Sequence, residues 1–276
     1  MKRTEKRFKT AAVILAALLW LLPLGAHAQT VRGDFDYDGD FDLSDVTQLI
    51  NYVLFEKWSD VPYGVERDTV TVKGIPIVMA RVEGGSYERF GGTVSVDGFW
   101  IAQTEVTQQL WQAVTGSNPS RNRGAAYKQH PVEQVTWNDC QAFIESLNEL
   151  TGRTFRLPTD LEWEFAARGG NYSRGTLYAG SDNPMLVAWY YDITGNCHKD
   201  VGLLKPNELG LYDMCGNVSE WVQDSYPLGQ PNNGTSRIYR GGNFMGTADQ
   251  NVIGYAGNYN INSSLYFLGL RLAMSE

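Results

Sequence analysis

The chain has 276 residues, a formal net charge of −8 at pH 7, eight tryptophans and 29 glycines. The acidic balance argues against nucleic acid or an anionic membrane surface as a partner. The length suits one large domain and one small module, and the glycines and tryptophans favour a loop-rich fold held by aromatic side chains. Cys140, Cys197 and Cys215 fit no zinc-binding spacing, and we interpret them as buried structural thiols.

Residues 1–28 have the three parts of a signal peptide. A basic start, MKRTEKRFK, precedes a short apolar run, and Ala26 and Ala28 form an A-x-A cleavage pattern. We expect cleavage before Gln29 and export to the periplasm, the cell surface or the medium. Removing a net +4 with this segment takes the formal charge from −8 to −12. An uncleaved anchor is the alternative, disfavoured by Pro23 and the short apolar run, and we expect no stable membrane insertion.

Residues 34–45, DFDYDGDFDLSD, predict a calcium-binding loop. The D-x-D-x-D-G pattern places Gly39 where an EF-hand loop turns sharply. The six crowded carboxylates repel each other, and Ca²⁺, a hard cation that takes about six to eight oxygens, relieves that repulsion. The predicted ligands are Asp34, Asp36, Asp38, Asp40 through its carbonyl, Asp42 and Asp45.

An apolar helical stripe follows this loop over residues 46–54. Because the loop ends in Asp45, where most EF-hands have Glu, residues 29–58 resemble one repeat of a dockerin type I module. Dockerins usually carry two such repeats and bind cohesins, whereas this chain has one. A calcium-stabilised spacer is therefore our preferred interpretation, and a cohesin-like partner is the alternative.

A polar linker over residues 59–68 leads to the main domain, predicted over residues 69–276. Alternating β-branched residues around Lys73 and Gly74 predict a hairpin, and residues 92–106 predict further strands.

Three helices are predicted from a capping residue at the start and a glycine at the end. They run from Thr107 to Gly116, from Thr136 to Gly152 and from Thr159 to Gly169. Beyond Gly170 no long helical pattern appears, so the domain is predicted to be α+β with long ordered loops. The second helix is expected to bury one face, made of Cys140, Phe143, Ile144, Leu147 and Leu150.

Several segments, in this order, resemble the sulfatase-modifying factor family, which has the formylglycine-generating-enzyme fold. They are residues 131–170, NELGLYDMCGNVSEWVQDSY, YRGGNF and LGLRLA. The resemblance implies a C-type-lectin-like architecture, with two helices around a small mixed sheet and long ordered loops.

The segment YDMCGNVSEW, residues 212–221, is a second calcium candidate. A glycine-containing turn between two carboxylates can aim backbone carbonyls at a cation. From the residues alone, the plainer interpretation is a Gly-Asn turn followed by a strand with a buried Trp221. The family resemblance implies a structural calcium ion, bound by the side chains of Asp213 and Glu220 and the carbonyls of Gly216 and Val218.

The sequence predicts no catalytic group. His130 and the adjacent Cys197 and His198 do not have a spacing that predicts nucleophilic catalysis. The family's oxidases convert a substrate cysteine to formylglycine with copper held by two thiolates. The resemblance places those two positions at Gly246 and Asn251, which cannot bind copper(I), so we expect no copper.

Residues 245–273 are interpreted as a contact surface that closes with an apolar run. Their spacing matches the family without a gap, but two arginines and a proline that the family usually has are missing. Tyr, Asn, Ser and Gly stand there instead, a composition that gives paratopes rigid contact area and adaptable hydrogen bonds. The predicted ligand-binding residues are Asn251, Tyr255, Asn258, Tyr259, Asn260, Asn262, Ser264 and Tyr266.

Some family members are diversified by retroelements in this segment, and the strip resembles theirs; an ordinary Asn-rich loop is the alternative. We predict a secreted, calcium-stabilised, non-catalytic protein that binds an unidentified protein or glycan through its C-terminal loops. The alternatives are a formylglycine-generating-type oxidase or maturation factor, and a dockerin-type scaffold component.

Overall fold

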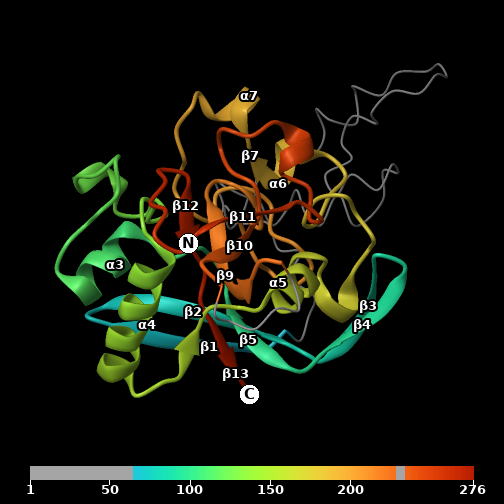
Figure 1. Cartoon of the computed structure of the whole chain (residues 1–276), viewed down its shortest axis with the longest axis horizontal. Coiled ribbons are helices and arrows are strands. Elements are labelled where there is room, and N and C mark those ends of the chain that lie inside the picture. The colour runs from blue at the N-terminus through green and yellow to red at the C-terminus, as the bar shows by residue number, and fades with distance from the viewer. Residues whose placement is uncertain (1–64, 228–233) are drawn as a thin grey trace, which may run out of the picture. The chain divides into compact units, whose positions relative to one another are not determined.

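The computed structural model describes residues 65–227 and 234–276. They form a mixed α/β fold with two curled sheets, short helices and long loops, as the sequence predicts (Figure 1). One sheet has the strand order β1-β2-β5-β13-β6, and the other has the order β11-β10-β9-β12. The predicted signal peptide, the first calcium loop and its helix lie outside the described residues.

The first sheet starts with the predicted hairpin. Lys73 and Gly74 both have positive φ, 48° and 83°, which suits the two-residue turn between β1 and β2. β1 begins at Arg67, two residues before the predicted start of the domain. The strands of this sheet are β1 (Arg67–Val72), β2 (Ile75–Val82), β5 (Phe99–Ala102), β6 (Phe155–Arg156) and β13 (Ala273–Ser275).

The three predicted helices are confirmed with their N-caps, but the third has Arg168, and not the predicted Gly169, as its C-cap. α3 (Gln108–Thr115) has Thr107 as its N-cap, and capping boxes start α4 (Trp137–Thr151) and α5 (Asp160–Ala167). α3 and α4 lie together beside β1 (Figure 1). The buried face of α4 is shorter than predicted, because Leu150 in its last turn is 54% exposed.

The second sheet carries the C-terminal half of the domain. It consists of β9 (Ser219–Ser225), β10 (Ser236–Arg240), β11 (Ala256–Asn260) and β12 (Leu268–Leu270). β12 runs parallel to β9, and the chain then crosses to β13 in the first sheet, which pairs with β5. The closing LGLRLA segment is therefore a core element that joins the two sheets.

The remaining elements are short. They are the pair β3 (Gly85–Arg89) and β4 (Gly92–Val96), the pair β7 (Ala188–Trp189) and β8 (Cys215–Gly216), and the four-residue helices α6 (Pro184–Val187) and α7 (Tyr191–Thr194). Within residues 65–227 and 234–276, no helix has the length and apolar character needed to span a bilayer.

A buried ion network joins α5 to β10 and β3. The fully buried Arg240 guanidinium donates to Asp160 at 2.5 Å and to Glu164 at 2.9 Å. Arg89 binds the same two carboxylates, at 2.6 Å and 3.1 Å. Removing one partner from such a cluster leaves a buried charge without compensation, which costs more than the pair itself contributes.

We therefore expect Arg240→Ala to lower the free energy of unfolding by about 3–5 kcal/mol. The control is Arg81→Ala, because Arg81 is partly exposed and pairs with Glu66 and Glu276 at the surface; that change should cost at most about 1 kcal/mol. Urea unfolding of both variants measures the difference. Equal losses would show that the buried network does not carry the stability we assign to it.

Candidate functional site

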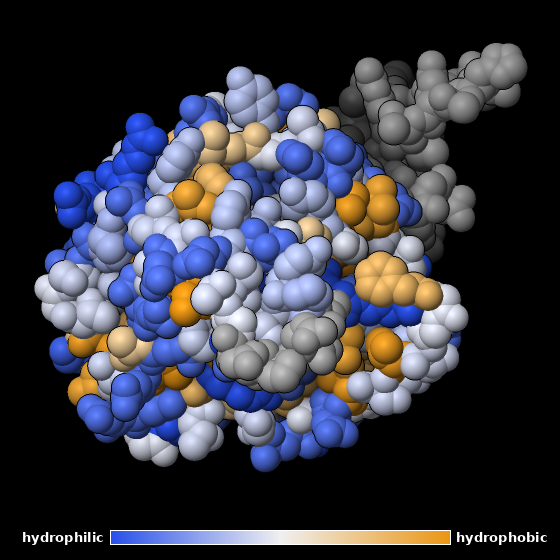
Figure 2. All heavy atoms as spheres, viewed as in Figure 1, coloured by the Kyte–Doolittle hydropathy of each residue, from blue (hydrophilic) through white to orange (hydrophobic). Residues whose placement is uncertain are grey.

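The predicted contact surface is built on an edge strand. β11 is the outermost strand of its sheet and pairs antiparallel with β10. Gly257 faces Tyr239 across this pair, and a Cβ at position 257 would collide with the Tyr239 hydroxyl. The strand can therefore approach the tyrosine only with glycine at this position. Figure 2 shows pale and blue residues over β10 and β11, without a continuous apolar patch.

An aromatic array holds this strand in place. The rings of Tyr239 and Tyr259 are stacked with centroids 5.1 Å apart, and Phe267 lies 6.3 Å from Tyr259. Burial raises the pKa of the Tyr239 hydroxyl, and hydrogen bonds with Tyr255 and Tyr259 raise it further. Tyr266 contacts Phe267, with ring centroids 5.6 Å apart. The predicted surface tyrosines Tyr255, Tyr259 and Tyr266 are therefore all held by contacts with neighbouring aromatic residues.

The loop after β11 is fastened to the start of α4. Gln134 N donates to Leu265 O at 3.0 Å, and the Ser264 hydroxyl donates to Gln134 O at 2.9 Å. The Asn138 amide donates to Asn262 Oδ1 at 3.0 Å. These bonds agree with the prediction that the strip is an ordered loop and not a frayed tail.

Seven of the eight predicted ligand-binding residues lie at least partly open to solvent. Asn251 is the correction: it is fully buried, and its amide donates to Thr247 O at 2.8 Å. Its side chain closes a loop inside the domain and cannot touch a ligand at the surface. The half-buried residues are Tyr255, Asn258, Tyr259 and Tyr266, and the exposed ones are Asn260, Asn262 and Ser264.

The two positions assigned to the family's copper-binding cysteines are neighbours in space. A Cβ built on Gly246 would lie 3.2 Å from Asn251 Nδ2. The three cysteines are free and stand elsewhere in the fold; Cys140 and Cys215 are buried as predicted, whereas Cys197 is only half-buried. Burial raises the pKa of the Cys140 thiol, and it raises that of Cys215 to about 12, so both stay protonated at neutral pH.

The second calcium candidate lies in a buried acidic cluster. Glu220 accepts two hydrogen bonds from Arg271 Nε at 3.0 Å, one from Arg271 Nη2 at 2.7 Å and one from Trp163 Nε1 at 2.6 Å. Asp213 Oδ2 accepts from Gly202 N at 2.7 Å, whereas its Oδ1 is buried without a hydrogen-bond partner. The Asp213 oxygen is therefore available to a cation, and the Glu220 carboxylate is already engaged.

Glu105, which sequence reasoning missed, completes this cluster. Its carboxylate accepts from Val218 N at 3.0 Å and from Asn217 Nδ2 at 2.8 Å, which holds the predicted Gly-Asn turn. Gly216 has φ 84°, and a Cβ there would strike the backbone of Trp189. A side chain 112 positions earlier in the chain gives no local signal for this contact.

This cluster has more carboxylates than positively charged groups, which is compatible with a bound cation. The carboxylates of Glu105, Asp213 and Glu220 are buried beside the single guanidinium of Arg271. Burial raises the pKa of Asp213 to about 6 and raises that of Glu105 well above its ordinary value. In the described ranges no three His, Cys, Asp or Glu side chains are arranged to hold a metal, so the ion would depend on Asp213 and on the carbonyls of Gly216 and Val218. The predicted ligands of the first calcium site, Asp34, Asp36, Asp38, Asp40, Asp42 and Asp45, lie outside the described residues.

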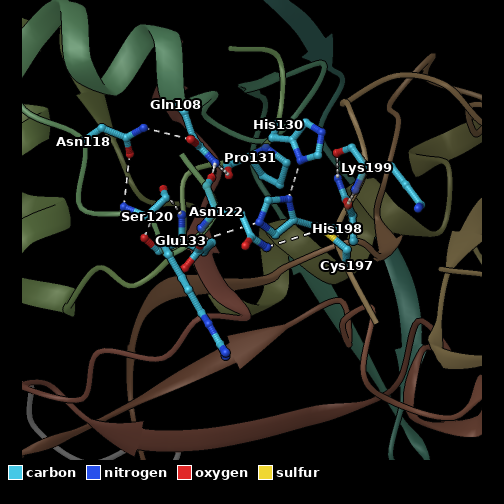
Figure 3. Close-up of polar contacts among 12 residues, drawn as sticks. Gln108, Asn118, Ser120, Asn122, His130, Pro131, Glu133, Cys197, His198 and Lys199 are labelled. Carbon is cyan, nitrogen blue, oxygen red and sulfur yellow. Dashed lines mark hydrogen bonds and ion pairs between the residues drawn. The ribbon is translucent and has the colours of Figure 1, made fainter. Parts of the chain in front are cut away.

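A second polar cluster joins His130 and His198, for which the sequence predicts no shared role (Figure 3). The Nδ1 atoms of His130 and His198 lie 2.6 Å apart. His130 Nε2 is 3.4 Å from Asp200, and His198 Nε2 is 3.5 Å from Glu133. The four side chains thus form a row in the order Asp200, His130, His198 and Glu133. The histidines are 68 residues apart, so only the fold brings them together.

The contact between the two rings needs one N–H. One Nδ1 donates and the other accepts, so the two rings take different roles in this bond. Burial and the neighbouring His198 lower the pKa of His130 to about 4, which favours a neutral His130 ring at pH 7.

The thiol that precedes His198 in the chain is bonded to a neighbouring side-chain amide. The Cys197 thiol accepts a hydrogen bond from the Asn122 amide at 3.4 Å, and Asn122 N donates to Glu133. Aromatic contacts lead from the pair toward the surface, because Phe244 lies 5.6 Å from the His198 ring and 6.3 Å from the Tyr266 ring. The cluster supports the rim of the predicted surface.

The lowered pKa of His130 makes stability depend on pH. The folded chain binds this proton more weakly than the unfolded chain, whose histidine pKa is about 6.5. The stabilisation is therefore present above about pH 6.5 and is lost as the pH falls toward 4. We expect His130→Gln to reduce the fall in Tm between pH 7 and 4.5 by roughly 2–4 °C, which is about 1 kcal/mol after solvent screening of this half-buried ring. An unchanged fall would contradict the assignment.

Comparison with known proteins agrees with this geometry. Chaperone protein LppX of Paenibacillus barcinonensis is 33% identical, over 72% of this chain and 89% of that protein. The formylglycine-generating enzyme of Thermomonospora curvata is 31% identical over 53% of each chain, so this chain spans about half of that enzyme's length.

Among solved structures, Treponema denticola variable protein 1 has a TM-score of 0.69 at 29% identity, covering 76% of this chain and 99% of that chain. A family profile described as the sulfatase-modifying factor enzyme 1-like domain matches residues 56–276, which is most of the chain. This chain therefore belongs to the family of sulfatase-modifying factor enzyme 1-like domains.

Proposed function

We propose that the protein is a secreted, calcium-stabilised binding protein without catalytic activity, and that it recognises its ligand through β11 and the loop that follows. The observation that carries this proposal is the set of tyrosines and asparagines presented at the surface by an anchored strand and loop. Tyrosine supplies rigid contact area, and Asn and Ser supply adaptable hydrogen bonds. Similarity to a variable protein over nearly that protein's whole length supports a surface that can change its specificity.

Export and calcium binding are parts of the same proposal. The signal-peptide pattern of residues 1–28 supports export, and the acidic loop at residues 34–45 supports one calcium ion. The unpartnered Asp213 oxygen supports a second ion. A retroelement as the source of diversity in residues 245–273 is a further part of the proposal, and the codons of this segment would test it.

A client-binding role is the second candidate. One relative is named a chaperone and matches across 89% of its length. In that role the partner would be another polypeptide, and the chain would act in its maturation without a thiol at position 246 or 251. Docking to a cohesin-like scaffold through residues 29–58 is a separate alternative, supported by the dockerin-like loop alone.

The binding surface can be tested with a glycan array and a phage library of random 12-residue peptides. Changing Tyr255, Tyr259 and Tyr266 together to Ala should weaken every captured ligand by more than about tenfold, because truncated aromatic anchors cost at least about 1–2 kcal/mol each. Tyr172→Ala is the control, since this tyrosine is 44% exposed and lies outside the surface. Retained binding by the triple variant, with conversion of a cysteine peptide to formylglycine, would favour the catalytic alternative.

Calcium can be tested by titration calorimetry on the chelator-treated full chain. We expect two sites and a rise in Tm on adding Ca²⁺, because an ion that binds only the folded chain stabilises it. Changing Asp36 and Asp38 to Ala should remove one site, and Asp213→Asn should weaken the other. Asp97→Asn, at an exposed acid, should change neither. A Tm that ignores both Ca²⁺ and chelator would overturn the calcium proposal.

A further inference from the structure

We propose that the free edge of β11 binds an extended polypeptide segment, which adds to the sheet as a further strand. The inference rests on the proposed function and deepens it, because it names the ligand class and the atoms that recognise it. β11 pairs with β10 on one side and is the last strand of the sheet in the described part of the chain. Its other side carries the recognising groups.

The register fixes which backbone groups point outward. Ile261 N donates to Thr235 O at 2.8 Å, so residues 261 and 235 form a hydrogen-bonded pair. On the other side of β10, Tyr226 N donates to Ser236 O, so residue 236 points toward β9. Hydrogen-bonded and non-bonded pairs alternate along an antiparallel ladder, so Gly257 and Tyr259 bond to β10.

The N–H and C=O groups of Ala256 and Asn258 therefore point away from β10. Asn260 has the same orientation, but its C=O already accepts from Ser263 N at 2.8 Å. The outward groups repeat every second residue, or about every 6.8 Å. An extended peptide backbone presents its own donors and acceptors with that same repeat, so strand addition satisfies them in order.

The edge also lacks the features that usually block strand addition. Natural edge strands are protected by charged residues, proline or bulges. β11 has the sequence AGNYN, without charge or proline, and it pairs with β10 in an unbroken register over all five residues. Ala256 and Asn260 are exposed.

The tyrosines favour a peptide over a glycan. A sugar ring binds on an open aromatic face, but one face of Tyr259 is stacked on Tyr239. The guanidinium of Arg121 lies over the Tyr266 ring, 4.9 Å from its centroid. Side chains of an added strand that point to the same face of the sheet as Tyr259 can pack beside that ring.

The test uses the full chain and the phage library of random 12-residue peptides. Asn258→Pro removes an outward N–H while leaving the bonds to β10, which suits proline at a strand edge. Asn258→Ala keeps the backbone and removes only the side-chain amide. We expect the proline variant to bind a selected peptide at least about tenfold more weakly and the alanine variant to lose less than about threefold.

N-methylation of the selected peptide, one residue at a time, gives a second measurement that does not depend on folding of a variant. Binding should fall at every second position, because alternate peptide N–H groups face β11. Gly254→Pro, at an exposed glycine outside the sheet, is the control for the proline itself. Tm values confirm that each variant folds.

Four results would overturn the inference. Equal losses for the proline and alanine variants would mean recognition by the side chain, and the absence of a two-residue pattern in the N-methyl series would exclude an added strand. Selection of glycans and no peptides would refute strand addition while leaving the proposed binding function intact. A dimer of the chain itself that Asn258→Pro dissociates would make the occupant a second copy.

Discussion

A single buried guanidinium, that of Arg271, joins the parts of the domain on which the surface depends. It donates to both oxygens of Glu220 on β9, to Ala102 O at the end of β5 and to Tyr212 O before the Gly-Asn turn. These segments are far apart in the sequence. Because a buried charge must have its partners, this arginine fixes how the two sheets and the turn are placed relative to one another.

Arg240, which precedes the predicted contact surface in the chain, is a second buried anchor and binds Asp160 and Glu164. The residues between β10 and β12 thus start and finish at fully buried arginines, and ladder bonds, an aromatic stack and the contacts to α4 hold them in between. Outward side chains such as Asn258 and Asn260 can change without disturbing these anchors. Residues that face the interior cannot change in this way. Gly257 leaves room for the Tyr239 ring, and the Asn251 amide bonds to the backbone of its own loop. The scaffold separates residues that keep the fold from residues that can set specificity.

The features that could be predicted from the sequence are formed by residues that lie close together in the chain. Helix starts at Thr107, Thr136 and Thr159 could be predicted because a cap and its helix lie within four residues. The β1–β2 hairpin likewise depends on two adjacent residues with positive φ. The edge position of β11 and the burial of Asn251 depend on contacts between distant parts of the chain. No local sequence pattern indicates such contacts.

The clusters were missed for the same physical reason. Glu105 meets Asn217 across 112 positions, and His130 meets His198 across 68. Such contacts are formed by tertiary packing, and a single sequence holds no periodicity that would indicate them. The family resemblance could supply Asp213 and Glu220, since they lie within one motif, but it did not show that Arg271 already engages the Glu220 carboxylate.

The burial of Asn251 removes one residue from the predicted contact surface. Positions 246 and 251 are adjacent, as two ligands of one metal ion would have to be. Here glycine and a buried, internally bonded asparagine fill them, so this spot offers neither thiolate nor exposed side chain. The other predicted contact residues lie farther along the chain, from Tyr255 to Tyr266, and are at least partly open to solvent. The proposed binding surface therefore does not include positions 246 and 251, where the family resemblance places the copper ligands. It lies at the neighbouring strand edge, whose backbone geometry is set by the pairing with β10.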